Sequence, residues 1–466
     1  MRSFKYVLVL IVSTLLVSCI TMKRTEKREN VVMVIDSDFD PKLDIYKNRI
    51  LGQYTLNCSE KNPEEKIDWE ALNKQLESMS DEDLLDFSLS NPDACRLEPS
   101  LKTYPQQSEE VMQIRKTWNN AVKSRDFSNI SQDTIKLFTE NFVYSHGTST
   151  SSVIAYKNPA AKMVLVQYWQ SADEAYDDDS TEEENTLEEE FVDACSDANA
   201  KSVIERYNKV MKSKAYREHH EKIPHSFGRE IQNIADKHRV SLVNYSMGYL
   251  PIKFIREIFT LVDCEHLGEF FINDIEIRQK QIEASKLFER DFLFVQAAGN
   301  EATKIDSKDE IAACNLNDNN HMMIGAFDAY GKISGFSNYG KCVDYYTLGS
   351  QVITAAPGGV LFPVDGTSFS SPLVVRLIST SLKGKRLGSW KTQLNGLADQ
   401  RKFLKGDAHI EKISFQSGVG KGLALTKQNF INFIEIRRKE KKRFMKRMSI
   451  SLAKQLASEI AEFMKK

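Results

Sequence analysis

A candidate nucleophile stands in the segment DGTSFSSPLV, residues 365–374, where Ser368 follows a Gly-Thr pair and precedes an apolar run. A serine hydroxyl attacks a carbonyl efficiently only when a base takes its proton, and that base, usually histidine, needs an acid to fix its tautomer. Among the eight histidines, His146 is the best candidate base, because the glycine beside it allows another backbone to approach closely. Asp36, which ends the apolar run VVMVID, is the candidate acid. Together these three residues could carry out acyl transfer.

Acyl transfer also needs a hydrogen-bond donor for the oxyanion that forms when the carbonyl is attacked. The segment AAGNE, residues 297–301, ends an apolar run with Gly299 and Asn300. An asparagine at the end of a strand can direct its amide into a cleft, so Asn300 is the candidate donor. For each of these residues the alternative is an ordinary structural position in a loop.

Short apolar runs recur along the chain at residues 31–36, 162–169, 240–248, 291–300 and 321–328. Such runs are typical of strands buried on both faces of a parallel sheet. Helical patterns lie between several of them, at 227–238 and 276–290. The alternation predicts a doubly wound parallel α/β sheet. Ligands bind such sheets beyond the carboxyl ends of the strands, where Asp36, residues 246–248 and Asn300 are expected to lie.

Two segments interrupt this alternation. Residues 52–140 are polar and mostly helical in pattern, without a sheet-like run. Residues 171–199 contain thirteen Asp or Glu and no Lys or Arg, which is typical of a solvated, mobile loop. Calcium binding is the alternative for this acidic segment, although its spacing does not match an EF-hand loop. A cluster of His219, His220 and His225 could hold a metal, but a solvated loop is the more ordinary interpretation.

Taken in order, these segments resemble the motifs of the subtilisin-like serine proteases. VVMVIDSDFD resembles the Asp motif of that family, HGTSTSSVIA its His motif and DGTSFSSP its Gly-Thr-Ser-x-x-x-Pro motif. AAGN resembles the motif of the oxyanion asparagine, and VNYSMG the substrate-binding strand. IGAFDAYGKISGFSNYG resembles the segment after the asparagine, and GVGKGLAL, residues 418–425, the closing strand. One motif alone is weak, but all occur in the family order, over residues 31–435 with the two insertions.

The resemblance implies a subtilisin-like α/β peptidase fold with a catalytic triad. Ser368 would be the nucleophile, His146 the general base and acid, and Asp36 the residue that orients His146. Asn300 and the backbone N–H of Ser368 would stabilise the oxyanion.

The resemblance also implies a peptide-binding edge made of Ser246, Met247 and Gly248, which would pair with an extended substrate by strand addition. Two positions depart from the family pattern. Asp38 stands where the family usually has glycine, and its carboxylate could change the electrostatics near Asp36 or bind a cation. Ser149 stands where a second histidine is common. Neither change removes a catalytic group.

Residues 1–22, MRSFKYVLVLIVSTLLVSCITM, combine a basic start with an apolar run at 6–17. That run is shorter than the roughly 20 apolar residues of a transmembrane helix and fits a secretory signal peptide over residues 1–18. It ends in LVSC, which resembles the bacterial lipobox, so Cys19 is expected to carry lipid, followed by a linker over residues 19–30. The alternative is an ordinary signal peptide with a chance cysteine. Ile20 resembles the outer-membrane pattern of Gram-negative lipoproteins, which predicts a cell-envelope location.

The other six cysteines are an even number, which allows disulfides in an oxidising compartment, and none forms a CxxC pair of the kind that binds zinc. The net charge of −2 gives no argument for a nucleic-acid partner. The tail 436–466 contains RRKEKKRFMKR, with eight basic residues, followed by an amphipathic helical pattern. That helix is expected to pack on the catalytic domain or to lie on an anionic membrane or on the acidic segment.

The sequence as a whole predicts a secreted, membrane-anchored serine endopeptidase that hydrolyses peptide bonds through an acyl-enzyme. Its expected partners are protein or peptide substrates and the membrane, with no cofactor; a structural calcium ion is left open. The main alternative is a catalytically silent, peptide-binding lipoprotein with the same fold. The third interpretation is a structural lipoprotein whose motif matches arise by chance.

Overall fold

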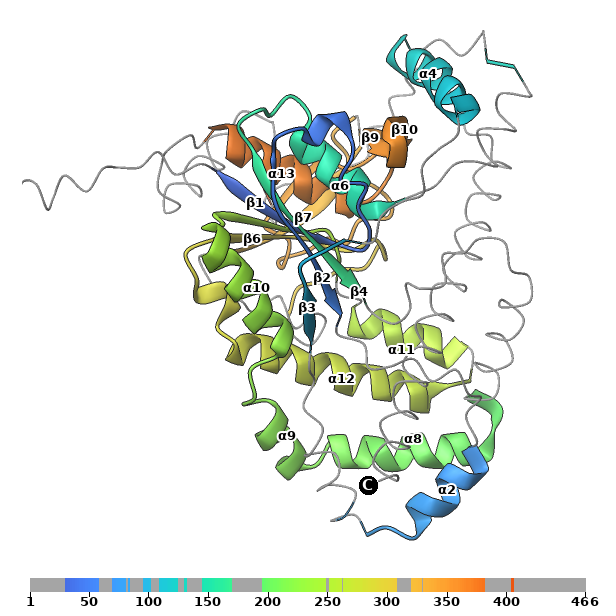
Figure 1. The fold of residues 1–466 in the computed structure, drawn as a ribbon. Helices are drawn as coiled ribbons and strands as arrows, with labels where there is room; N and C mark the ends of the chain where they lie inside the picture. The colour runs from blue at the N-terminus through green and yellow to red at the C-terminus, as the bar shows by residue number, and fades with distance from the viewer. Residues whose placement is uncertain are drawn as a thin grey trace, which may run out of the picture.

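A sheet with helices on both faces forms the centre of the computed structural model (Figure 1). The structure describes residues 30–57, 69–80, 83, 95–101, 109–124, 130–131, 145–169, 195–248, 251–261, 263–307, 320–328, 330–381 and 404–405. Within these residues the sheet has nine strands in the order β11-β8-β7-β6-β5-β1-β4-β2-β3. The two edge strands, β11 and β3, run antiparallel to their neighbours, and every other pairing is parallel. The predicted doubly wound parallel sheet is therefore confirmed.

Each predicted apolar run contains a strand of this sheet, namely β1, β4, β5, β6 or β7, whereas β2, β3, β8 and β11 were not predicted. The strands are β1 (Val31–Asp36), β2 (Ile50–Asn57), β3 (Arg96–Glu98), β4 (Lys162–Trp169), β5 (Leu242–Tyr245), β6 (Leu293–Ala297), β7 (His321–Phe327), β8 (Tyr345–Leu348) and β11 (Leu404–Lys405). All six residues of β1 are buried, because β1 lies in the interior of the sheet between β4 and β5. A strand covered on both faces has no solvent side for polar residues, which explains its continuous apolar run.

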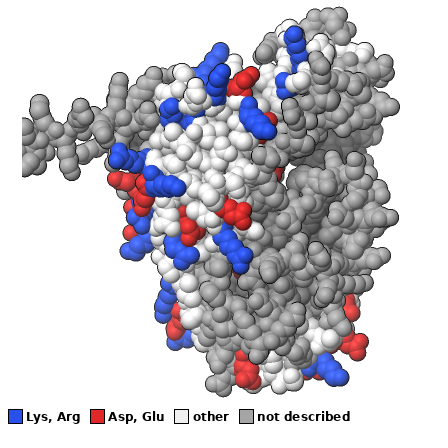
Figure 2. Space-filling model, viewed as in Figure 1, with Lys and Arg blue, Asp and Glu red and all other residues white. Residues whose placement is uncertain are grey.

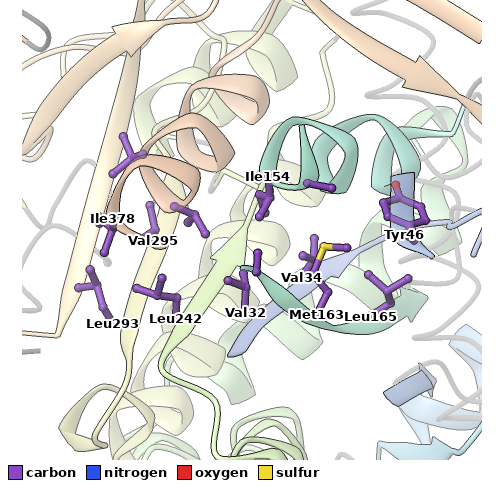
Figure 3. Close-up of a cluster of buried hydrophobic side chains, with 14 of the residues drawn as sticks. Val32, Val34, Tyr46, Ile154, Met163, Leu165, Leu242, Leu293, Val295 and Ile378 are labelled. Atoms are coloured by element: carbon purple, nitrogen blue, oxygen red, sulfur yellow. The ribbon is translucent and has the colours of Figure 1, made fainter. Parts of the chain in front are cut away.

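Helices α6 (His146–Ala155) and α13 (Thr367–Ser381) cover one face of the sheet (Figure 1). Figure 3 shows the core beneath them, where Val32 and Val34 of β1 and Met163 of β4 lie below Ile154 of α6, with Ile378 of α13 alongside. The opposite face is covered by α10 (Ser226–His238) and the carboxyl end of α12 (Glu265–Ala284). The two cores together hold the carboxyl ends of β1, β5 and β6 in a fixed arrangement.

Two sequence expectations about secondary structure are wrong. Residues 52–140 do contribute to the sheet, because β2 pairs with β4 and β3 pairs with β2. Strand β2 was not predicted because its sequence, ILGQYTLN, is not a continuous apolar run. Its polar residues alternate with Tyr54 and Leu56, which pack into the core on one face of the sheet. The helix expected at 276–290 is α12, which begins at Glu265 and ends at Ala284. The helix at 227–238 is confirmed as α10, with one more residue at its start.

A separate helical layer packs beyond the sheet around its own hydrophobic core. It consists of α2 (Trp69–Glu77), α8 (Ala198–Met211), α9 (Lys214–His220), α11 (Ile252–Leu261) and the first half of α12. A disulfide joins Cys195, just before α8, to Cys264, the residue that precedes α12. Cys95 and Cys342 are disulfide-bonded as well. The expectation that the cysteines allow disulfides is therefore confirmed for these four residues.

Helix α4 (Glu109–Ser124) holds the two-stranded hairpin of β9 (Val352–Ala356) and β10 (Val360–Val364). Trp118 Nε1 donates to the Leu361 carbonyl at 2.9 Å, and Asn119 Nδ2 donates to the Gly359 carbonyl at 2.8 Å. The Leu361 N–H donates in return to Asn119 Oδ1 at 2.6 Å, and Arg115 donates to the Gly358 carbonyl. The chain runs from this hairpin directly into the segment of Ser368.

Charged side chains of both signs are interspersed on the face shown in Figure 2. The ion pairs of the described residues include Lys212 with Glu269 at 2.8 Å and Arg278 with Asp274 at 2.8 Å. Among the described residues, no helix has both the length and the apolar character needed to cross a bilayer. The proposed signal peptide, Cys19, most of the acidic segment 171–199, the segment 418–425 and the tail 436–466 lie outside the described residues.

Candidate active site

Asp36 lies at the carboxyl end of β1 and is completely buried. Its Oδ1 is 2.6 Å from Nδ1 of His146 and accepts the Ser37 N–H at 2.8 Å. Its Oδ2 accepts the hydroxyl of Thr150 at 2.9 Å. A carboxylate is an acceptor only, so these contacts assign the proton to Nδ1 of the neutral imidazole and leave Nε2 as its acceptor nitrogen. Asp36 therefore fixes both the orientation and the tautomer of His146.

His146 is the first residue of α6, and the start of that helix explains the His-Gly-Thr sequence. Ser145 caps the helix by accepting the Thr148 N–H with its hydroxyl. The carbonyl of Asp38 passes so close to Gly147 that a Cβ there would lie 2.2 Å from the oxygen. Only glycine fits at this position, as the sequence predicted. The side chain of His146 is 25% exposed, so part of the imidazole is accessible to solvent.

The loop after β1 ties α6 to the hairpin that precedes Ser368. The Asp40 N–H donates to the Thr148 hydroxyl at 2.7 Å, while Asp40 Oδ2 accepts the Gly358 N–H at 2.7 Å. Tyr46 donates its hydroxyl to the Thr148 carbonyl at 3.0 Å and contacts the Ser151 hydroxyl at 2.7 Å. Burial raises the pKa of Tyr46 well above its usual value, so this hydroxyl stays protonated. The segments that carry Asp36, His146 and Ser368 are thereby linked.

Ser368 is the second residue of α13 and is 9% exposed. The ring of Phe369, its neighbour in sequence, lies 5.6 Å from the ring of His146, which puts the beginnings of α13 and α6 side by side. The Ser368 hydroxyl donates to the Ser246 carbonyl at 2.8 Å. The structure therefore brings Ser368 to the same edge as His146 and Asp36, with its hydroxyl turned toward the end of β5.

The proline of the Ser368 motif has a direct consequence for the serine. Pro372 lies inside α13, and because it has no N–H it cannot donate to the carbonyl four residues earlier, which belongs to Ser368. The Ser246 hydroxyl takes that role and donates to the Ser368 carbonyl at 2.8 Å. Asn244 Nδ2 in turn donates to the Ser246 hydroxyl at 2.8 Å. Ser246 and Ser368 therefore exchange two reciprocal hydrogen bonds.

Asn300 follows β6 and lies beside the start of α13. Its Oδ1 accepts both the backbone N–H of Thr367, at 2.9 Å, and the Thr367 hydroxyl, at 3.0 Å. With the oxygen of the amide engaged by Thr367, the orientation of the side chain is set and Nδ2 is its donor. The N–H of Ser368 belongs to the first turn of α13, where backbone N–H groups have no partner within the helix. These two donors come from neighbouring elements.

Residues 246–248 lie between β6 and the start of α13. A Cβ on Gly248 would lie 2.7 Å from the Cα of Gly299, so the two segments are in close contact. Gln296 Nε2 donates to the Met247 carbonyl at 3.3 Å. The expected peptide-binding residues Ser246, Met247 and Gly248 are therefore adjacent to the oxyanion candidate.

Sequence reasoning missed two hydroxyls that hold the site. Thr150 lies four residues after His146, on the same face of α6, and bonds Asp36. The helical spacing of the HGTST segment could have indicated it. Thr367, which fixes Asn300, precedes Ser368 directly, and nothing in the spacing of the two segments indicated that contact.

The structure describes several of the side chains that the sequence offered as alternative cation ligands. Among the described residues, no group of three His, Cys, Asp or Glu side chains is placed to hold a metal. Asp38, half-buried, contributes its backbone carbonyl to the Ser145 hydroxyl. His219 and His220 belong to α9 rather than to a loop, the ring of His220 is tilted against that of Tyr216 with centroids 4.1 Å apart, and His225 caps α10.

Comparison with protein families gives a match over most of the chain. The family model described as the subtilase family matches residues 27–398. "Subtilisin-like protease 3" of Trichophyton equinum and of Arthroderma otae are each 51% identical over 41 residues, which are 9% of this chain and 10% of the relative. The chain thus matches only about a tenth of the length of these curated relatives.

Solved structures with a similar outline include the prenylagaramide maturation protease PagA, at 15% identity and a TM-score of 0.37. That similarity covers 80% of this chain and 84% of the other. A cold-adapted subtilisin-like serine proteinase has 13% identity and a TM-score of 0.34, over 81% of this chain and 84% of the other. The family model spans most of the described sheet and every candidate active-site residue, and the chain belongs to the subtilase family.

Proposed function

We propose that this protein is a serine endopeptidase that uses Asp36, His146 and Ser368 as a catalytic triad. The observation that carries the proposal is the 2.6 Å contact between the buried Asp36 carboxylate and His146 Nδ1, at the end of the sheet where Ser368 lies in the first turn of α13. This contact leaves Nε2 of His146 as the basic nitrogen, which is what general-base catalysis requires.

In the proposed acylation step, the Ser368 hydroxyl turns from the Ser246 carbonyl to Nε2 of His146 and attacks the scissile carbonyl. His146 takes the proton from the hydroxyl and then gives it to the leaving amine. Asp36 stays ionised and stabilises the imidazolium that forms between the two transfers. Water then attacks the acyl-enzyme with His146 again as base, which releases the second product and restores Ser368.

The negative oxygen of the tetrahedral intermediate would be bound by Asn300 Nδ2 and by the Ser368 N–H. Both donors are held before substrate arrives, the first through Thr367 and the second by its place at the start of α13. Pre-oriented donors lower the barrier because they need not reorganise when charge develops. The N-terminal end of α13 adds a favourable partial positive charge.

The substrate is proposed to be an extended peptide that pairs with Ser246, Met247 and Gly248 as an added strand. The Ser246 carbonyl holds the Ser368 hydroxyl at rest, so a substrate N–H that took this carbonyl would release the hydroxyl for catalysis. No cofactor takes part in the proposed reaction.

The protein is further proposed to be a lipoprotein of a bacterial cell envelope, anchored at the outer membrane through Cys19. The support is the basic start, the short apolar run and the LVSC sequence at residues 1–19. Cys19→Ser should abolish partition with membranes. A mature N-terminus, mapped by mass spectrometry, that lies anywhere other than a lipid-bearing Cys19 would refute the anchor.

A catalytically silent peptide-binding protein is the second candidate, and one observation favours it. The Ser368 hydroxyl points to the Ser246 carbonyl in this structure. A fluorophosphonate probe distinguishes the two, because it reacts only with an activated serine. The enzyme is expected to incorporate one probe at Ser368, whereas a silent protein would incorporate none, as would the Ser368→Ala control.

A further inference from the structure

Asn338 is a fully buried side chain that hydrogen-bonds to residues before and after Asn300 in the turn that follows β6. Its Nδ2 donates to the Ala298 carbonyl at 2.9 Å and to Glu301 Oε2 at 2.5 Å. Its Oδ1 accepts the Thr303 N–H at 2.9 Å. The exposed fraction of Asn338 is 0%, so both amide donors and the amide oxygen are used inside the protein.

The backbone of Asn338 adds a further bond to the same turn. Its N–H donates to the Gly299 carbonyl at 3.1 Å. Gly299 has a φ of 96°, a conformation that favours glycine, and a Cβ on it would lie 2.5 Å from Asn338 Nδ2. The next residue along, Asn300, carries the proposed oxyanion donor. The conformation of this turn therefore depends on Asn338 filling the space beside Gly299.

Asn300 is thus held at two points that belong to different elements. Thr367 of α13 fixes its side-chain oxygen, and Asn338 fixes the backbone on both sides of it, at Ala298, Gly299 and Thr303. A shift of the backbone moves Nδ2 directly, because the side chain has only two torsions and its oxygen is already bound. The position of Nδ2 relative to the attacked carbonyl is set by both anchors.

We infer that Asn338 is a positioning residue for the oxyanion donor of this enzyme. It acts through Asn300 and does not contact substrate, and the inference rests on the proposed role of Asn300. Misplacement of a catalytic donor by about 1 Å can cost on the order of 100-fold in rate. Its loss should therefore lower kcat, while KM, which depends on residues 246–248, changes little.

The test measures kcat and KM on one fluorogenic peptide for wild type, Asn338→Ala, Asn300→Ala and the double variant. Asn273→Ala is the matched control. Asn273 is 2% exposed and donates its Nδ2 to Asn208 Oδ1 at 3.1 Å, but it lies in the helical layer. Thermal unfolding of every variant reports the purely structural cost of removing a buried amide. If Asn338→Ala does not fold, Asn338→Ser, which keeps one hydroxyl in the space, takes its place.

Asn338→Ala is expected to lower kcat by about 10- to 100-fold, with KM within about 3-fold of wild type. In the Asn300→Ala background the same substitution should lower kcat by less than about 2-fold, since the donor it positions is gone. Asn273→Ala should lower the unfolding temperature without changing kcat.

Equal losses of kcat in both backgrounds, or a kcat unchanged by Asn338→Ala, would overturn the inference and leave the triad intact. If Asn300→Ala has the kcat of wild type, Asn300 does not stabilise the oxyanion, and the inference about Asn338 is wrong as well. Turnover that survives Ser368→Ala would instead overturn the proposed function itself, so the failures are distinguishable.

Discussion

At the scale of single residues, a serine side chain at the candidate site replaces a hydrogen bond that the backbone of α13 cannot make. Pro372 removes the donor that the Ser368 carbonyl would have within α13, and Ser246 supplies it from the end of β5. The helix that carries the proposed nucleophile is thereby attached to the strand end proposed to bind substrate. The Gly-Thr-Ser-x-x-x-Pro motif and the serine of VNYSMG are therefore joined by the reciprocal hydrogen bonds between Ser368 and Ser246.

Ser246→Ala should destabilise the protein by about 1 to 3 kcal/mol, because it leaves the buried Ser368 carbonyl without that donor. The same substitution should cost much less in a Pro372→Ala background, where the alanine N–H can donate to the carbonyl. Urea unfolding of the four proteins measures the coupling. Ser370→Ala is the control, since it removes a buried hydroxyl with longer bonds of 3.3 and 3.4 Å. Strictly additive effects of the two substitutions would contradict this account.

His321 is a buried histidine outside the proposed triad. It lies at the start of β7, is packed by the rings of Phe288 and Phe294, and its Nε2 contacts Gln296 Oε1 at 2.9 Å. Burial lowers the pKa of His321 from 6.5 to about 4. The folded state therefore binds fewer protons than the unfolded state between these values. The stability due to neutral His321 is complete above about pH 6.5 and declines as pH falls toward 4.

His321→Gln, which keeps an amide donor for Gln296, should remove that pH dependence. Between about pH 7 and pH 4.5, wild type should lose about 2 to 3 kcal/mol more unfolding free energy than the variant. Chemical denaturation at both pH values provides the measurement. Equal losses in wild type and variant would show that His321 titrates normally in the folded protein.

At the scale of elements, small hydroxyl residues let α6 lie directly on its neighbours. Residues 147–155 are all buried, and Ser152 accepts the Ala355 N–H of β9 at 2.9 Å. Helix α4 contacts the same end of this hairpin through Trp118 and Asn119, because their partner Leu361 pairs with Ala355 in the register of β9 and β10. The hairpin that leads to Ser368 is therefore fixed between α6 and an inserted helix.

Asn119→Ala should release the end of this hairpin, because Asn119 both donates to Gly359 and accepts from Leu361. Hydrogen exchange of a peptide spanning residues 357–364 should become faster by about 10-fold, equivalent to about 1.4 kcal/mol of local stability. Asn120→Ala, at the exposed neighbour, is the control and should leave the rate unchanged. Identical exchange in both variants would mean that α4 does not hold the hairpin.

At the scale of the whole molecule, a disulfide within the helical layer closes a loop of the chain that also passes through the sheet. The disulfide of Cys195 and Cys264 closes a loop with a sequence separation of 69 residues, which includes α8, α9, α10 and β5. Such a crosslink restricts the unfolded chain, and a loop of this length gives a large effect in that model. The strand end with Ser246 lies within the closed loop.

The double substitution Cys195→Ser and Cys264→Ser should lower the unfolding free energy by about 2 to 5 kcal/mol. The variant should still fold, since the clusters on both faces of the sheet do not involve these cysteines. Urea unfolding under non-reducing conditions measures the loss. An unfolding free energy equal to that of wild type would show that the crosslink contributes no net stability.

The sequence predicted the parts of this molecule that follow from local pattern. Strands such as β1 and β4 are continuous apolar runs, and the residues at strand ends met at one sheet edge because parallel strands share a direction. The sequence did not predict the features that depend on contacts between residues far apart in the chain. Strand β2 is polar enough to look helical and is a strand because it pairs with β4. Thr367 and Asn338 contact the turn of Asn300 because α13 and the segment beyond β7 pack against that turn, and no local pattern indicates this packing.

The central claim is that Ser368 is a nucleophile activated by His146, and one measurement tests it most directly. Purified protein is incubated with a mixed peptide library, and products are followed by mass spectrometry for wild type and Ser368→Ala. Wild type is expected to cleave internal peptide bonds. Ser368→Ala is expected to show only background turnover, with the same unfolding temperature as wild type. Cleavage at the wild-type rate by Ser368→Ala, or none by folded wild type, would contradict it.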